Sequence, residues 1–438
     1  MTTRIDYPQK FERIVAQTQF GLLPTAEQAF LKQKAYEFRF TQQELRLLSE
    51  MALERVRWKE SPLSGQWPVG GINGAAVNDA AVNDGAAKKR AFALLREKQD
   101  ALRSQENDYR NLSPRDKPRT QKPLLKTVAR PKLGLGRCPV ASERTRCCNL
   151  MTLDAVKKCG FDCSYCSIQS FYHGNQVQFD SGFADKLSRL KLDPDKTYHI
   201  GTGQSSDSLM WGNHQGVLQA LCDFADRHPN VILELKTKSR NIGWLLKNRV
   251  PRNVVCTWSL NPQTIIDCEE HLSASLSQRL DSAKALADKG CVVGFHFHPI
   301  IHYRGWETDY RAICQNLMAQ FDASQVAMVS MGTLTFTKSV MKTIRQRALT
   351  SKILQMPMTQ SAGKFSYPTD IKLKLFRQVY GALGDWHDPV FFYLCMEPQA
   401  LWEPVFGFDY ADNDAFEAAM KNAYFAKIIN IRANTGHL

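Results

Sequence analysis

Three cysteines stand close together at Cys159, Cys163 and Cys166, with the spacing Cys-x3-Cys-x2-Cys. Three thiolates on one short loop can hold three corners of a cubane iron–sulfur cluster, which leaves the fourth iron without a protein ligand. An iron with an open position can bind a substrate or a cofactor. A closed tetrahedral zinc site needs a fourth protein ligand, and the nearby Cys147 and His173 keep that alternative open.

The loop that carries these cysteines follows the first of six short runs of β-branched and aromatic residues. Amphipathic helical stretches separate the runs, which cover residues 149–156, 197–203, 231–239, 254–261, 291–301 and 326–334. Such alternation requires parallel strands with right-handed crossovers, in an open sheet or a barrel. Reactive groups gather at the carboxyl ends of the strands in both layouts. The cysteines therefore lie where a site is expected.

The residues before the cysteines differ in character from this core. Residues 1–108 are expected to be helical, with capping boxes at Thr25 to Gln28 and Thr41 to Glu44, interrupted by a Gly/Ala/Asn-rich linker at 61–87. Residues 109–146 form a basic segment with interspersed prolines, which is either a solvated connector or an arm that contacts nucleic acid. The core is expected at 147–345 and a C-terminal extension at 346–438.

Composition limits the class of protein. The chain has 438 residues, 43% hydrophobic and 23% charged, which excludes a fibrous or largely disordered protein. Its net charge is +14, and residues 1–150 hold 27 Lys and Arg against 16 Asp and Glu. This excess favours a nucleic acid or another polyanion as partner. No run of 18 apolar residues and no signal-peptide pattern occur, so we expect a cytoplasmic protein that does not bind membranes.

The cysteine triplet, with Tyr165 before its third member, resembles that of the radical S-adenosylmethionine (SAM) superfamily. The resemblance implies a partial (β/α)6 barrel and a 4Fe–4S cluster on Cys159, Cys163 and Cys166. The unique iron of that cluster would chelate the amino and carboxylate groups of S-adenosyl-L-methionine. One electron, from a donor such as flavodoxin or ferredoxin, would then cleave this cofactor and produce a 5′-deoxyadenosyl radical.

Further blocks are similar to those of the spore photoproduct lyase family. They read IGTGQSSDSL (200–209), ELKTKSRNIGWLL (234–246), TWSLNP (257–262), GFHFHPIIHYRGWETDYRA (294–312) and FYLCMEP (392–398). They occur in the family's order across roughly residues 147–410. The resemblance implies a lyase, of the carbon–carbon class, that acts on DNA in its repair or modification.

The same resemblance assigns individual residues. Ser206, Lys238 and Ser259 match the positions that contact the methionine part of the cofactor, and we group Gln204 with them. Taken without the resemblance, Lys238 is equally well a surface cation and Ser259 a strand-end hydroxyl.

The chain departs from the family pattern where the lyases return a hydrogen atom. Gln204 stands at the position of the lyase cysteine, and Ser167 replaces a tyrosine after the third cluster cysteine. A carboxamide cannot donate hydrogen as a thiol can, because its N–H bond is much stronger than S–H. We therefore name Cys395 and Tyr165 as candidate catalytic residues for this step.

Two other interpretations of the function remain open. The substrate could be a small molecule or a protein, or the triplet could be a structural metal site in a non-enzymatic binding module. His296 and His298 project to the same side of one expected strand, which is compatible with a metal pair or with polar residues near a substrate.

Overall fold

The computed structural model describes residues 6–68, 85–112, 123–138, 144–172, 174–347, 349–361 and 363–435. Most of the linker expected at 61–87, parts of the basic segment at 109–146, and His173 lie outside the described residues. The chain divides into two compact units. The first comprises residues 1–118 and 345–357, and the second comprises residues 119–344 and 358–438.

The first unit is helical, as the sequence predicts. Its helices are α1 (Tyr7–Val15), α2 (Thr25–Phe38), α3 (Gln42–Trp58) and α4 (Gly85–Ser104). The capping box at Thr41 is confirmed, because its hydroxyl accepts from the Glu44 amide and the Glu44 carboxylate accepts from the Thr41 amide. The box expected at Thr25 is wrong. Pro24 is the N-cap there, and Gln28 donates instead to the carbonyl oxygen of Leu23.

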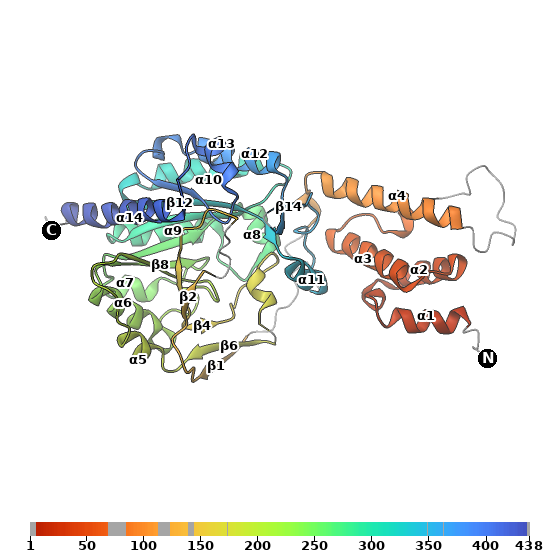
Figure 1. The fold of residues 1–438 in the computed structure, drawn as a ribbon, viewed down its shortest axis with the longest axis horizontal. Coiled ribbons are helices and arrows are strands. Elements are labelled where there is room, and N and C mark those ends of the chain that lie inside the picture. Colours follow the sequence, from red (N-terminus) through yellow and green to blue (C-terminus); the bar gives the residue numbers. More distant parts are fainter. Residues whose placement is uncertain are drawn as a thin grey trace. The chain divides into compact units, whose positions relative to one another are not determined.

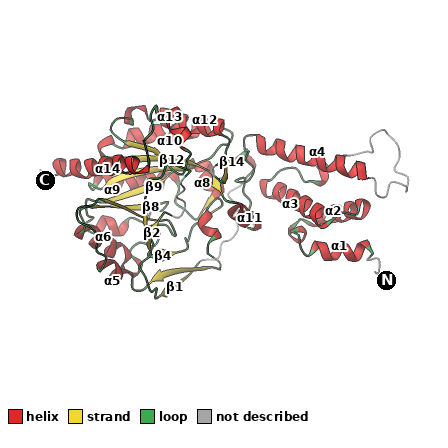
Figure 2. Cartoon of the chain, viewed as in Figure 1, coloured by secondary structure: helices red, strands yellow, loops and turns green. Residues whose placement is uncertain are grey.

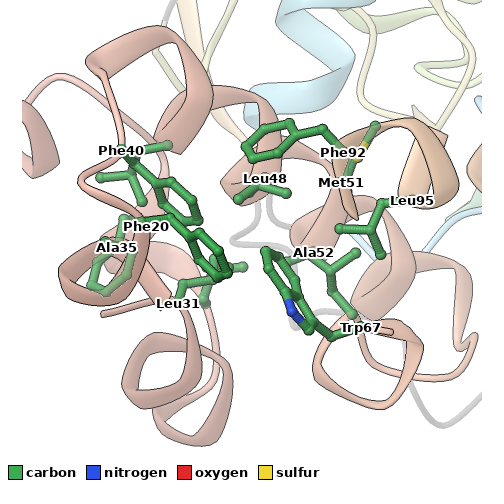
Figure 3. Packing of buried hydrophobic residues seen from close by; sticks show 14 of the residues in the cluster. Phe20, Leu31, Ala35, Phe40, Leu48, Met51, Ala52, Trp67, Phe92 and Leu95 are labelled. Carbon is green, nitrogen blue, oxygen red and sulfur yellow. The ribbon is translucent and has the colours of Figure 1, made fainter. Parts of the chain in front are cut away.

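Aromatic and aliphatic side chains from these helices form a core of their own (Figure 3). The rings of Phe40 and Phe92 pack edge to face with centroids 5.6 Å apart, which joins α4 to the turn between α2 and α3. Residues 345–357 complete the unit, since Arg345 contacts Glu54 at 3.1 Å and Lys352 contacts Glu60 at 2.8 Å. The N-terminal helices are therefore a packed bundle.

The second unit is built on an eight-stranded sheet in the order β16-β12-β11-β9-β8-β7-β3-β2. Neighbouring strands are parallel except for the antiparallel pair β2 and β3. The strands are β2 (Leu135–Arg137), β3 (Met151–Leu153), β7 (Tyr198–Thr202), β8 (Val231–Thr237), β9 (Val254–Ser259), β11 (Val292–Ile300), β12 (Val326–Thr333) and β16 (Phe391–Leu394). All six predicted strands are present.

The sheet is curled into a half-barrel, with helices around it (Figures 1 and 2). The helices of this unit are α5 (Phe183–Ser188), α6 (Val217–Arg227), α7 (Gly243–Lys247), α8 (Gln263–Glu269), α9 (Leu276–Asp288), α10 (Trp306–Gln320), α11 (Lys338–Gln346, whose last two residues belong to the first unit), α12 (Thr369–Gly381), α13 (Trp402–Phe406) and α14 (Asn413–Thr435). Every residue of β9 and β12 is buried, as expected for parallel strands covered on both faces. Gly290, with φ +87°, follows the end of α9 as predicted.

Short strands add to this frame. They are β1 (Leu124–Val128), β4 (Val156–Lys157), β5 (Asp162–Cys163), β6 (Gln176–Asp180), β10 (Glu270–His271), β13 (Thr335–Phe336), β14 (Thr359–Ser361) and β15 (Lys364–Ser366). Two of the predicted segments contain strands that the sequence analysis did not indicate. The basic segment contributes β1 and β2, and the α+β C-terminal extension contributes β16 to the main sheet. Among the described residues, none of the helices combines the length and apolar character needed to cross a membrane.

Candidate active site

The cysteine triplet lies on the loop that follows β3 and β4, at the carboxyl end of the first parallel strand. Cys163 belongs to β5 and pairs with Glu270 of β10. Met210 packs against the start of the loop, where its sulfur lies 3.9 Å from Cys159 Sγ. A Cβ on Gly160 would lie 2.7 Å from Cζ2 of the Trp211 ring, so a larger residue would require this ring to move. The loop is therefore closely packed before any ligand binds.

Two thiols of this loop, those of Cys159 and Cys163, are held neutral when no cation is bound. Burial raises the pKa of Cys159 and of Cys163, and the charges of Asp207 and Glu270 respectively add to the effect. A metal group would have to replace these protons, as metal binding at cysteine generally does.

The geometry bears on which metal group the loop could hold. Among the described residues, no group of three or more His, Cys, Asp or Glu side chains is arranged to hold a metal ion. A single ion draws all its thiolate ligands to about 2.3 Å from one point. A cubane cluster instead binds each cysteine at a different iron, so its ligands stand apart. The loop supplies three cysteine thiols, which is the ligand type that such a cluster takes.

A cavity of about 470 Å³ adjoins the loop at the carboxyl ends of the strands. Its lining brings together most of the predicted site residues, namely Tyr165, Cys166, Gln204, Lys238, Ser259 and Cys395. Ser206 lies outside this lining. It is 5% exposed, and its hydroxyl accepts from Trp211 Nε1 at 3.3 Å.

Lys238 does not stand alone in this cavity. Its Nζ lies 3.1 Å from Glu270 Oε1, and its backbone amide donates to Asp207 at 2.7 Å. Asp207 also accepts from the amides of Leu209 and Met210, so it ties the loop after β7 to the end of β8. An ammonium group has three donors, and one contact with Glu270 leaves others for a bound carboxylate.

Glu270 is the centre of a buried polar network. Its carboxylate accepts from Arg279 at 2.6 Å, from Asn261 at 2.7 Å and from the Tyr165 hydroxyl, besides Lys238. Burial raises the pKa of Glu270, but the charges of Arg279 and Lys238 and these hydrogen bonds together bring it well below its usual value. Glu270 therefore stays ionised and fixes the orientation of two cavity residues.

A second buried carboxylate, Glu234 of β8, lies in the cavity wall. It accepts from His296 and His199, both through Nε2 at 2.8 Å, and from Thr257 at 2.9 Å. Burial and the charge of Lys236 lower the pKa of His296 to about 4, so this imidazole is neutral at neutral pH. Because His296 donates from Nε2, its Nδ1 is an acceptor, and that atom has no partner in the described part of the chain.

Sequence reasoning missed both carboxylates. Glu234 had a usable signal, since it is the lone acid inside the apolar run VILEL. A charged residue in a fully buried strand requires partners, and these are usually functional or structural polar groups. Glu270 lies just beyond α8 with no motif around it. Only the pairing of β10 with β5 brings Glu270 next to Cys163 of the cysteine loop.

The turn after β7 allows a close backbone approach at Gly203, which has φ +94°. An added Cβ would lie 2.7 Å from the carbonyl oxygen of Lys236 and 2.9 Å from Ser208 Oγ. We expect Gly203→Ala to lower the free energy of unfolding by about 1–3 kcal/mol. Urea unfolding measures this. Gly243→Ala, where a Cβ meets open space, is the control and should change the value by less than about 0.5 kcal/mol. Equal stability of the two variants would contradict the expected crowding.

The curled parallel sheet and the cysteine loop after its first parallel strand define the radical SAM class of folds. The family model described as spore photoproduct lyase matches residues 155–372. A spore photoproduct lyase from Clostridium acetobutylicum is 24% identical over 223 residues, covering 49% of this chain and 64% of that protein. One from a Geobacillus species is 23% identical over 202 residues, covering 44% and 59%. The chain thus spans about three fifths of the length of these curated relatives.

Solved structures agree on the fold. A spore photoproduct lyase complexed with dinucleoside spore photoproduct superimposes with a TM-score of 0.52 at 19% identity, covering 64% of this chain and 87% of that one. A mutant lyase with bound AdoMet and the same dinucleoside gives a TM-score of 0.50 at 19% identity, covering 62% and 82%. The chain therefore shares the fold of the spore photoproduct lyases and is similar to them in sequence over about half of its length.

Proposed function

We propose that this protein is an iron–sulfur radical SAM enzyme of the lyase-like type. Cys159, Cys163 and Cys166 would hold a 4Fe–4S cluster, and the adjoining cavity would hold S-adenosyl-L-methionine. One observation carries the proposal: Cys166 belongs both to the triplet and to the lining of the 470 Å³ cavity. A group bound by the triplet would therefore face the cavity. When bound, such a cluster would supply the electron for reductive cleavage of the cofactor.

The chain's own residues would bind and orient the cofactor. Lys238, held by Glu270, offers its remaining N–H donors to a carboxylate. The Ser259 hydroxyl and the Gln204 carboxamide add polar contacts from two other strand ends. Ser206 acts as a positioning residue, because it contacts Trp211, which packs against the cysteine loop at Gly160. The neutral His296, also in the cavity lining, donates from Nε2 to Glu234 and so holds that carboxylate in place.

A nucleic acid, DNA in the first instance, is the proposed substrate. The support is the family relationship, the dinucleoside photoproduct named in the related complexes, and the excess of Lys and Arg in residues 1–150. A one-electron donor such as flavodoxin or ferredoxin would reduce the cluster in the cytoplasm. The spore lesion itself is not assigned as the substrate, because Gln204 stands here at the position of the hydrogen-returning lyase cysteine.

The test is reductive cleavage by anaerobically reconstituted protein. We expect a reduced-cluster EPR signal that changes when S-adenosyl-L-methionine is added, and formation of 5′-deoxyadenosine. Dinucleoside spore photoproduct and ultraviolet-irradiated DNA, each deuterated at thymine, serve as probes, and transfer of deuterium into 5′-deoxyadenosine from either would identify nucleic acid as substrate.

Two outcomes would overturn parts of this proposal. An intact cluster that forms no 5′-deoxyadenosine, or zinc without iron in protein purified anaerobically, would exclude the enzymatic function. Formation of 5′-deoxyadenosine without label from either DNA probe would instead favour a small molecule or a protein as substrate.

A further inference from the structure

Four cysteines outside the triplet lie together at the edge of the cavity. They come from three segments: Cys138 directly follows β2, Cys147 and Cys148 precede β3, and Cys395 directly follows β16. Backbone hydrogen bonds join these segments. The Cys138 amide donates to the Leu150 carbonyl at 3.0 Å, and the Arg146 amide donates to the Glu397 carbonyl at 3.3 Å.

The four thiols line two neighbouring cavities. Cys138, Cys148 and Cys395 line the large cavity that also contains Gln204. All four line a small neighbouring cavity of about 20 Å³, and Cys147 lines only this second one. Cys395 and Cys148 thus border both the proposed radical site and the second cavity, whereas Cys147 borders the second cavity alone.

The protonation of these thiols differs along that path. Burial raises the pKa of Cys395 to about 12, so its sulfur keeps a hydrogen atom at neutral pH. A hydrogen bond from Cys148 lowers the pKa of Cys147 to about 6, while that of Cys148 is raised. Cys395 and Cys148 are therefore protonated, whereas Cys147, which does not line the large cavity, is a thiolate and is easier to oxidise than a thiol.

We propose that Cys395 donates the hydrogen atom that Gln204 cannot, and that Cys148 and Cys147 carry the resulting oxidising equivalent outward. This inference rests on the proposed radical SAM function. It assigns the cysteines at the cavity wall a redox role that replaces the missing lyase thiol, and it needs no second metal group.

The steps balance in atoms and electrons. The Cys395 S–H bond breaks and a C–H bond forms on the substrate radical, which leaves a thiyl radical on Cys395. That sulfur takes a hydrogen atom from Cys148, whose own thiyl radical then takes an electron from the Cys147 thiolate. A one-electron donor of the class that also reduces the cluster restores the Cys147 thiolate, and Cys148 regains a proton from water.

A substrate-free reaction in D2O tests the donor directly. Thiol hydrogens exchange with solvent, whereas carbon-bound hydrogens do not, so a radical quenched by Cys395 should acquire one deuterium. We expect most of the 5′-deoxyadenosine formed without substrate to carry one deuterium. In Cys395→Ser the labelled fraction should fall about tenfold, because a serine O–H bond is too strong to donate.

A control variant and a rescue variant accompany this test. Cys291→Ser, whose thiol lines neither cavity, should leave the labelled fraction unchanged. Adding Gln204→Cys to Cys395→Ser should restore the label by placing a thiol at the lyase position. Unlabelled product from the unmodified protein, or an unchanged fraction in Cys395→Ser, would overturn the inference. Absence of all 5′-deoxyadenosine would instead contradict the proposed function.

Two measurements do not depend on turnover. Mild diamide oxidation of the metal-free protein should produce a disulfide between the peptide that contains Cys147 and Cys148 and the peptide that contains Cys395. The reconstituted protein should hold about four irons per chain, as one cubane requires. About eight irons, with four of them lost in Cys395→Ser, would show a second cluster and overturn the thiol relay.

Discussion

Replacing Cys166 with alanine is expected to lower the iron content from about four atoms per chain to below about one, and to abolish 5′-deoxyadenosine formation. The physical reason is that a cubane held by three cysteines has no spare protein ligand. Cys166 is half-buried at the cavity wall, so its loss leaves little unfilled core volume. Iron analysis and the cofactor-cleavage assay after anaerobic reconstitution measure both effects.

The control for this prediction is Cys291→Ala, which removes a thiol that is 6% exposed at the start of β11. We expect that variant to keep its iron even if it loses some stability. The circular dichroism spectrum and melting temperature of Cys166→Ala should stay close to those of the unmodified protein. Full iron content in Cys166→Ala would show that the triplet does not bind the cluster.

The sheet was predictable because most of its strands can be recognised from their own residues. A run such as VVCTWS is buried on both faces in a parallel sheet, so nearly every residue is apolar or small. β16 was harder to place, because its sequence FFYL lies far from the other strands and only long-range pairing with β12 brings it into the sheet. β1 and β2 were missed because basic residues and prolines around them indicate an extended connector.

Residue spacing alone predicted the site only where sequence neighbours form it, whereas the family resemblance was needed to select the distant Lys238, Ser259 and Cys395, which line the same cavity. The triplet is one short loop, so its spacing alone indicates the chemistry. The second group of cysteines, Cys138, Cys147, Cys148 and Cys395, joins three segments that meet through the sheet. The burial of individual side chains was equally hard to predict from the sequence. Without the family resemblance, the sequence leaves Lys238 equally well a surface cation or a ligand, and the structure pairs it with the buried Glu270 at 3.1 Å.

Replacing Glu270 with glutamine is expected to lower the free energy of unfolding by about 3–5 kcal/mol, because it leaves buried cations without a counter-charge. The Arg279 side chain is fully buried, and that of Lys238 is largely so. Urea unfolding followed by circular dichroism measures the change. Asp281→Asn, an exposed carboxylate on the same helix as Arg279, should change stability by less than about 0.5 kcal/mol.

The pH dependence of this effect has a defined sign. The pKa of Glu270 is lower in the folded protein than in the unfolded chain, so its stabilising effect is complete above the unfolded value of about 4.3. It is lost as the pH falls from that value toward the folded pKa. The stability difference between the unmodified protein and Glu270→Gln should therefore be largest near pH 7 and shrink below pH about 4.

A double variant separates charge pairing from packing. Adding Arg279→Met to Glu270→Gln removes one buried cation together with its lost partner, so we expect it to recover part of the stability. Recovery would show that an unpaired charge, rather than lost packing, causes the defect. If Glu270→Gln alone were as stable as the unmodified protein, the Glu270 network could not be what holds Lys238 and Tyr165 at the cavity wall. Their placement would then have to come from the β5 and β10 pairing itself.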